Sequence, residues 1–274
     1  MKTTKILTLT LGAGLAACTP AELPARAPFE PTRFSVEVQG TGPDVILIPG
    51  LTAGRDVWSG TVRAVPGYRY HLVQVAGFAG DPPRGNAEGD VVAPLAEEIG
   101  RYIAASGLQR PAIVGHSMGG TVAMMIAARQ PDRVGRVMVV DMLPQPAGLL
   151  GSSAANMGPL ANSLRDLAAT PGGRRLFESF LGNRGSDSDV VARAMHELAT
   201  TDLTTELGRI RVPFAVVYAA PDARMQARAD ANYRAAYAHA RDARLVRIDD
   251  SGHMIMYDQP RRFHEELKGF LAAR

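Results

Sequence analysis

Short apolar runs recur along the chain at intervals that suit the buried strands of one sheet. Most contain β-branched residues and end within two residues of a glycine, a proline or an aspartate, which is typical of strands buried on both faces. Five runs have this form: residues 45–48, 71–75, 111–114, 136–140 and 214–219. A first strand is predicted at residues 34–38, and residues 244–248 alternate in character as an edge strand does.

The segments between these runs predict helices, so strands and helices alternate along the chain. Residues 120–129 are rich in Ala and Met and predict a buried helix, and another helix is expected from about residue 258. This alternation, with short connections, predicts an α/β fold with a mostly parallel, doubly wound sheet. With 274 residues and 46% hydrophobic content, the chain can bury such a core as one domain.

Residues 144–207 fit no simple strand–helix unit. Within this stretch, residues 160–167 and 190–198 have helical spacing. We therefore expect a small helical cap, inserted between the strands at 136–140 and 214–219.

The most informative motif is Gly115-His116-Ser117-Met118-Gly119, which follows a predicted strand and opens a predicted helix. A serine on so sharp a strand-to-helix turn is strained and exposes its hydroxyl. The flanking glycines leave room for the strand and the helix to approach. The bare Gly-x-Ser-x-Gly pattern also occurs by chance, but its context here favours a nucleophile elbow with Ser117 as the nucleophile.

From about Phe34 to its C-terminus, the chain resembles the serine α/β-hydrolases of the esterase, lipase and haloperoxidase-like group. The resemblance implies an α/β-hydrolase fold. It includes Pro49-Gly50 and Trp58, which match the spacing of the family's His-Gly dipeptide and tryptophan, with proline where histidine is usual. In the family, this loop and the residue after the nucleophile supply two backbone N–H groups to an oxyanion hole. Those groups would here come from Leu51 and Met118.

The resemblance also implies an acid and a base that follow the serine along the chain. His253 lies in a Gly-His sequence after the last predicted strand, where the family carries its base. Asp222, after the 214–219 strand, is the expected acid. Asp141, after the 136–140 strand, is the alternative, because some relatives carry the acid there. Either aspartate could instead cap a helix or a turn. His116 adjoins the serine, but its side chain is expected to point away from the turn.

A serine, an aspartate and a histidine in this order imply a serine hydrolase that cleaves carboxylic esters of short or medium acyl chain through an acyl-enzyme. The same triad could act instead on a lactone, a thioester, a C–C bond or a peptide bond, since the fold does not fix the substrate. A third hypothesis is a non-catalytic envelope binding protein on a hydrolase fold. Such a protein would be expected to lose a triad residue, and all three residue types are present.

The composition argues against nucleic acid, metal and nucleotide cofactors as partners. The formal net charge is +3, and the basic residues are scattered instead of forming a stripe interleaved with aromatic residues. The sequence has no dinucleotide-binding Gly-x-Gly-x-x-Gly and no P-loop, and its single cysteine and six histidines show no metal-ligand spacing. The expected partner is a small-molecule ester, with no cofactor.

The N-terminus has the form of a bacterial lipoprotein leader. Residues 1–17 combine a basic start with an apolar run too short to span a bilayer comfortably, and they end in Leu-Ala-Ala before Cys18. This sequence resembles a lipobox, in which the cysteine becomes the lipidated first residue of the mature chain. Residues 18–32 carry four prolines and predict an extended tether, which leaves residues 33–274 as the hydrolase domain.

Several acyl groups on one cysteine give stable membrane attachment. We therefore expect the protein in the bacterial cell envelope, held by a lipid anchor on the periplasmic face. Thr19 after the cysteine resembles the pattern that is sorted to the outer membrane. Ordinary secretion, or a soluble periplasmic protein, is the alternative.

Overall fold

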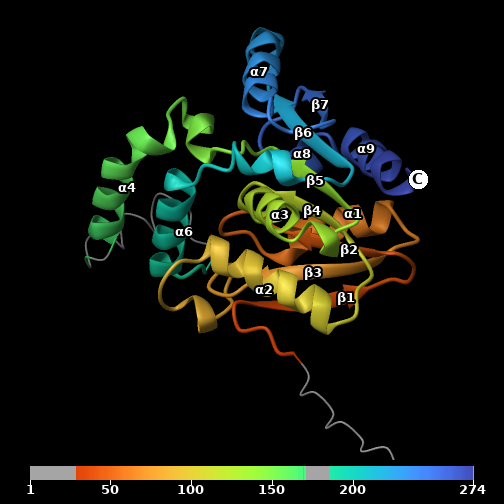
Figure 1. Cartoon of the computed structure of the whole chain (residues 1–274), viewed down its shortest axis with the longest axis horizontal. Helices are drawn as coiled ribbons and strands as arrows, with labels where there is room; N and C mark the ends of the chain where they lie inside the picture. Colours follow the sequence, from red (N-terminus) through yellow and green to blue (C-terminus); the bar gives the residue numbers. More distant parts are fainter. Residues whose placement is uncertain (1–28, 169, 171–184, 274) are drawn as a thin grey trace, which may run out of the picture.

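The computed structural model of the chain describes residues 29–168, 170 and 185–273 (Figure 1). Its centre is a seven-stranded sheet with the strand order β1-β3-β2-β4-β5-β6-β7. β1 pairs antiparallel with β3, and all the other neighbouring pairs are parallel. The strands are β1 (Phe34–Gln39), β2 (Asp44–Ile48), β3 (Arg69–Val75), β4 (Ala112–His116), β5 (Arg136–Val140), β6 (Phe214–Ala220) and β7 (Arg244–Asp249). The seven predicted strands and the mostly parallel α/β sheet are confirmed.

The predicted leader, Cys18 and most of the predicted tether fall in residues 1–28, outside the described part of the chain. Among the described residues, no helix combines the length and the hydrophobicity that crossing a bilayer requires. The lipoprotein hypothesis therefore stays a prediction from the sequence.

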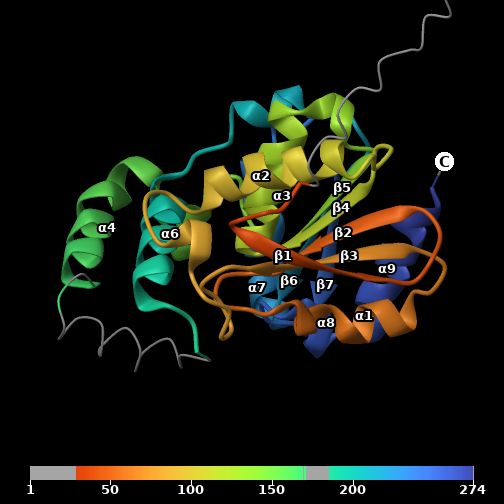
Figure 2. The same ribbon diagram turned by 90° about the horizontal axis from the view of Figure 1, so that it is seen from below.

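Both faces of the sheet are buried, and alternate residues of a strand belong to different layers. In β2, Ile46 and Ile48 lie in one buried cluster, and Val45 and Leu47 lie in the other. The helices of the first layer are α2 (Val92–Ala105), α3 (Met118–Arg129) and α7 (Ala223–Ala236). The second layer holds α1 (Ser59–Ala64), α8 (Ile255–Asp258) and α9 (Pro260–Ala272), which lie across the sheet from α2 and α3 in Figure 2.

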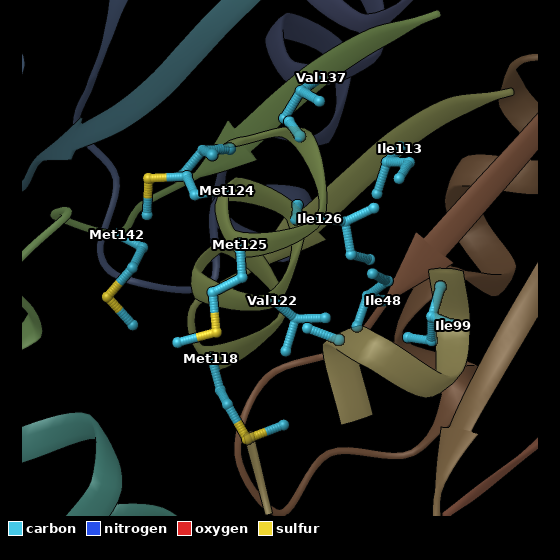
Figure 3. Packing of buried hydrophobic residues seen from close by; sticks show 14 of the residues in the cluster. Ile48, Ile99, Ile113, Met118, Val122, Met124, Met125, Ile126, Val137 and Met142 are labelled. Atoms are coloured by element: carbon cyan, nitrogen blue, oxygen red, sulfur yellow. The ribbon is translucent and has the colours of Figure 1, made fainter. Parts of the chain in front are cut away.

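Helix α3 is buried along nearly its whole length, since eleven of its twelve residues are buried. Figure 3 shows Val122 and Ile126 of this helix pointing toward three isoleucines of the sheet and of α2: Ile48, Ile99 and Ile113. A helix that is apolar on all sides belongs in the interior of a protein. Burial of its Ala and Met side chains therefore holds α3 against the sheet. The first residue of the helix lies at the carboxyl end of β4.

Two glycines allow β4, α3 and β2 to meet where no side chain would fit. A Cβ atom at Gly115 would collide with the backbone oxygen of Gly119, and a Cβ atom at Gly119 would collide with the backbone oxygen of Ile48. These neighbours are backbone atoms, which cannot move aside as the end of a side chain can. The close approach predicted from the motif is therefore present, and it holds the turn at Ser117 against the end of β2.

The strand order of the sheet reverses between β2 and β4. The chain runs from β2 to β3 on one side, and it later places β4 on the other side of β2. Open α/β sheets bind ligands at the carboxyl ends of the two strands that flank such a switch point. The residues that follow β2 and β4, which include Leu51 and Ser117, are therefore in the position where a ligand is expected.

A helical insertion lies between β5 and β6, where the cap was expected. Its described elements are the 3-10 helix η4 (Pro146–Leu150), α4 (Ala154–Ala168), α6 (Ser188–Thr200) and the 3-10 helix η5 (Glu206–Arg209). In both views α6 lies between α4 and the rest of the molecule (Figures 1 and 2). The two predicted helical stretches lie in α4 and α6, whereas η5 extends two residues past the predicted boundary at residue 207.

Candidate active site

Ser117 lies at the turn between β4 and α3, with a backbone φ of 53° and ψ of −123°. A residue other than glycine rarely adopts a positive φ, and strain of this kind gathers at functional sites. The turn is held by hydrogen bonds: the Ser117 N–H donates to the carbonyl of Val140 at 3.0 Å, and the Ser117 carbonyl accepts from Gly120 at 2.7 Å. The sharp turn predicted from the motif is therefore present, with the serine at its tip.

His253 lies on the loop between β7 and α8, and its ring is hydrogen-bonded to Asp141. The distance from His253 Nδ1 to Asp141 Oδ2 is 2.8 Å. Because a carboxylate only accepts, Nδ1 carries a proton, and in the neutral imidazole Nε2 is then the nitrogen without one. An imidazole in this state can take a proton from a serine hydroxyl, and the carboxylate stabilises the imidazolium that forms.

Asp222, the acid expected from the sequence, does not contact His253. It is the N-cap of α7, where its carboxylate accepts from the backbone N–H groups of Arg224 at 2.8 Å and Met225 at 3.2 Å. Its other oxygen lies 3.4 Å from the guanidinium of Arg224. The expectation is therefore corrected in favour of the alternative, Asp141, because the start of α7 engages the carboxylate of Asp222. Asp before a helical run is a common capping pattern, and that reading describes this residue better.

Asp141 follows β5 and is fixed by contacts to both of its carboxylate oxygens. While Oδ2 binds His253, Oδ1 accepts from the Tyr233 hydroxyl and from the Ala219 backbone N–H, each at 2.9 Å. The residue is only 8% exposed. Since each oxygen has a donor, neither acceptor of this buried side chain lacks a partner, and its orientation toward His253 is fixed.

Tyr233 belongs to a stack of tyrosines from α7 and β6. Its ring lies 4.2 Å from the ring of Tyr218 and 6.2 Å from that of Tyr237, with the rings nearly parallel. The Tyr237 hydroxyl donates to the carbonyl of Met142 at 2.6 Å, next to Asp141 in the chain. Burial, followed by the nearby charge of Asp141, raises the pKa of Tyr233 well above its usual value. Tyr233 therefore remains a hydrogen-bond donor to the carboxylate.

His116 connects the strand before the serine to the loop that carries His253. The two rings lie 4.7 Å apart, and His116 Nε2–H donates to the backbone carbonyl of His253 at 2.9 Å. Burial, together with the charge of His253, lowers the pKa of His116 to about 4. His116 is therefore neutral at neutral pH. No motif in the sequence indicates this contact, through which His116 fixes the backbone of the candidate base.

The two N–H groups expected in an oxyanion hole are both free. Within the described part of the chain, neither the Leu51 nor the Met118 backbone N–H donates to a protein acceptor. Met118 is the first residue of α3, where the helix leaves its N–H groups without an internal partner and its dipole favours negative charge. The two loops touch, since a Cβ atom at Gly50 would lie 3.1 Å from Ser117 Cβ. Two free donors beside the serine could hold a developing oxyanion.

An apolar pocket of about 240 Å³ opens between the insertion and the Leu51 loop. It is lined mainly by Ala, Leu, Met and Pro side chains, and His196 is the polar residue among them. His196 Nε2 is hydrogen-bonded to Asn162 Oδ1 at 2.8 Å, which joins α6 to α4. The lining residues are Leu51, Met142, Pro146, Ala147, Leu149, Met157, Ala161, Ala192, Met195, His196, Leu198 and Ala199. This lining suits a hydrocarbon chain.

A larger cleft of about 680 Å³ lies on the other side of the insertion, between η4 and α7. His253 and Asp141 are in its wall, and Leu149 lines both this cleft and the apolar pocket. We refer to these two spaces as the apolar pocket and the His253 cleft. Among the described residues, no group of three or more His, Cys, Asp or Glu side chains could hold a metal ion.

Ser117 and His253 are candidates from the sequence, whereas Tyr233 is a contact that only the structure reveals. A tyrosine in the middle of a polar helix carries no motif, and its bond to Asp141 joins residues 92 positions apart. The signal that existed was its position, since Tyr233 is the residue of α7 that is buried. A single large buried side chain on a polar helix indicates a specific contact with the sheet.

A model of the alpha/beta hydrolase family matches residues 45–266 of the chain. A pimeloyl-[acyl-carrier protein] methyl ester esterase of Aeromonas salmonicida is 27% identical, over 86% of this chain and 98% of that protein. Among solved structures, an esterase from Exiguobacterium antarcticum has a TM-score of 0.69 at 20% identity, covering 88% of this chain and 96% of its own. The enol-lactonase from Burkholderia xenovorans has a TM-score of 0.66 at 20% identity, covering 88% of this chain and 97% of its own. At these identities, the solved structures support the fold.

Tyr233→Phe is expected to destabilise the protein by about 2 kcal/mol, because a buried carboxylate loses a charge-assisted hydrogen bond. Tyr237→Phe, in the same stack, loses a bond to a neutral carbonyl and should cost about 1 kcal/mol. Urea unfolding of the two variants beside the wild type measures both values. A cost for Tyr233→Phe no larger than that for Tyr237→Phe would contradict the role given to Tyr233.

Acidification is expected to destabilise the protein through His116. In the folded state the His116 ring binds a proton only below about pH 4. In the unfolded state a histidine binds one below about pH 6.5. The unfolded state therefore binds more protons in this window, and the free energy of unfolding should fall as the pH drops, by up to about 3 kcal/mol. His116→Gln can still donate to the His253 carbonyl but does not titrate. In urea unfolding at several pH values, the free energy of unfolding of this variant should fall less between about pH 6.5 and pH 4 than that of the wild type. An equal fall in both proteins would contradict the role given to His116.

Proposed function

Because the chain belongs to the alpha/beta hydrolase family, we propose that it is a serine hydrolase that cleaves carboxylic esters of short or medium acyl chain through an acyl-enzyme. The observation that carries the proposal is the 2.8 Å hydrogen bond between His253 Nδ1 and Asp141. It leaves His253 Nε2 as a base on the loop that His116 anchors beside the serine turn. The triad proposed is therefore Ser117, His253 and Asp141.

The reaction begins when His253 Nε2 takes the Ser117 hydroxyl proton and the oxygen attacks the ester carbonyl. Within the described residues no hydrogen bond joins Ser117 Oγ to His253. Such contacts are often long in ligand-free sites and tighten when the substrate binds. The negative charge on the carbonyl oxygen accepts hydrogen bonds from the Leu51 and Met118 N–H groups. His253 then gives its proton to the leaving alcohol, and water attacks the acyl-enzyme by the same steps in reverse order.

The apolar pocket supports an acyl chain as the group that Ser117 retains. Leu51, whose N–H is proposed to bind the oxyanion, also lines this pocket, so a chain attached to the carbonyl carbon can enter it. At about 30 Å³ per water-sized group, a pocket of about 240 Å³ holds on the order of eight heavy atoms. Three methionines, Met142, Met157 and Met195, line it, and this flexible side chain accommodates varied shapes. The relatives that cleave a methyl ester are consistent with this reaction class.

We also infer an envelope lipoprotein from the N-terminal sequence. Residues 1–17 are the proposed leader, Cys18 the lipidated residue, and residues 18–32 a tether to the hydrolase domain of residues 33–274. The proposed location is the periplasmic face of the cell envelope, at the outer membrane, since threonine follows the cysteine. A tether of this kind would let the site reach esters near the membrane surface.

The catalytic proposal is tested with the purified, detergent-solubilised protein on a series of p-nitrophenyl esters from acetate to palmitate. Ser117→Ala, His253→Ala and Asp141→Asn are each expected to lower kcat at least about a hundredfold, as loss of a triad member does. Asp222→Asn is the matched control, because it changes the same chemical group at the end of the neighbouring strand. Its kcat should stay within about threefold of wild type.

A larger loss in Asp222→Asn than in Asp141→Asn would return the acid to Asp222. A wild-type protein inert on every ester would then be treated with a fluorophosphonate. Labelling of Ser117 would retain the serine hydrolase and redirect the search to lactones, thioesters, C–C bonds or peptide bonds. Absence of labelling would favour the non-catalytic binding protein.

The lipoprotein proposal predicts that Cys18→Ser moves the protein from the membrane fraction to the soluble fraction of the cell envelope. The hydrophobic energy of the acyl chains is lost with the thiol that carries them. Fractionation and the intact mass of the mature chain check this outcome. Unchanged membrane association, or a wild-type mass without acyl groups, would favour ordinary secretion.

A further inference from the structure

One face of α7 forms a wall of the His253 cleft. The residues of this helix that line the cleft recur at intervals of three and four, which places them along one side of the helix. They include Met225, Arg228, Ala229, Asn232, Tyr233 and Ala236. Tyr233 binds Asp141, so the face that fixes the proposed acid continues directly into the wall of the cleft.

Arg228 is the charged residue of this face, and no carboxylate in the described part of the chain pairs with it. The other two arginines of α7 have carboxylate partners: Arg224 lies 3.4 Å from Asp222, and Arg234 lies 3.7 Å from Asp230. In the described part of the chain, Arg228 forms neither an ion pair nor a hydrogen bond.

The carboxylates near this wall are engaged elsewhere. Asp230 binds Arg247 at 2.6 Å and the Tyr218 hydroxyl at 2.9 Å, and Asp222 caps the helix. Among the described residues that line the cleft, Asp141 is the one carboxylate, and both of its oxygens already have donors. The cleft therefore presents a positive charge with no negative partner from the described residues around it.

Asn232 lies four residues after Arg228 on the same face and also lines the cleft. Its side-chain amide makes no hydrogen bond in the described part of the chain. The two residues together offer the planar fork of a guanidinium and the NH₂ of an amide. This is a donor set that suits the oxygens of a carboxylate or a phosphate.

We propose that the His253 cleft binds the leaving alcohol of the ester, and that this alcohol carries an oxyanion, a carboxylate or a phosphate, which Arg228 and Asn232 bind. The inference rests on the proposed function, because His253 must give its proton to the leaving group and is itself in the wall of this cleft. The acyl chain occupies the apolar pocket, and the described residues that line it include no arginine, lysine, aspartate or glutamate. The acyl end of the substrate thus meets an apolar lining, and the alcohol end meets a lining that carries a positive charge.

The test compares three octanoyl esters that differ in the alcohol: glycerol, glycerol 3-phosphate and glycerate. Release of octanoate by the detergent-solubilised protein gives kcat/KM for each ester. The wild type is expected to prefer the two anionic esters over the neutral one by about tenfold, the scale of one charge-assisted contact. The preference should shrink at high salt, because the contact is exposed to solvent. The ratio between the phosphate and the carboxylate ester identifies which oxyanion the site favours.

Arg228→Gln is expected to lower kcat/KM for the two anionic esters by about tenfold and to affect the neutral ester much less, so that the preference is lost. Arg228→Lys should keep part of the preference. Arg224→Gln is the matched control, because it removes a paired arginine from the same helix outside the cleft wall. Equal effects of Arg228→Gln on all three esters, or a wild type that prefers the neutral ester, would overturn the inference and leave the serine hydrolase intact. Failure of the wild type to cleave any ester, with no fluorophosphonate labelling, would instead refute the proposed function.

Discussion

The backbone contact at Gly115, Gly119 and Ile48 is the constraint on which the rest of the site depends. No side chain fits between β4, α3 and β2 at this point, so the serine turn is pressed against the end of β2. That contact brings the Leu51 loop beside the first N–H of α3 and leaves both donors free. It also places the ring of His116 beside that of His253, where a hydrogen bond from His116 fixes the backbone of the candidate base. Local sterics in one motif thus position groups from three separate loops.

The sequence predicted the strands, the buried helix after the serine and the insertion, because each depends on local patterns of apolar residues. The sharp turn at Ser117 and the loop position of His253 could also be predicted, since a strand-to-helix turn with flanking glycines and a Gly-His loop carry their own signatures. No local sequence pattern could decide between Asp222 and Asp141 as the partner of His253. Both aspartates end parallel strands at the same edge of the sheet, and strand endings alone cannot separate them. What separates them is a contact 112 residues apart in the chain and the competing use of Asp222 as a helix cap.

Helix α7 contacts the candidate site through three different parts of its surface. Its N-terminus holds Asp222, its buried tyrosine holds Asp141, and its exposed face forms a wall of the His253 cleft. The helix is polar overall, and Tyr233 is its buried residue. Its packing against the sheet therefore depends on the tyrosine stack more than on a broad apolar face. The tyrosine that orients Asp141 and the residues that line the cleft are consequently coupled through the rigidity of a single helix.

Leu149, on η4, lines both the apolar pocket and the His253 cleft, and it is 43% exposed. One side chain on a short helical turn therefore acts as the partition between two compartments of different polarity. A smaller residue there would join the compartments, and a larger one would narrow both at once. With the acyl and alcohol ends placed as proposed, divergence toward new substrates would meet a trade-off at this position, because selectivity for the two ends would change together.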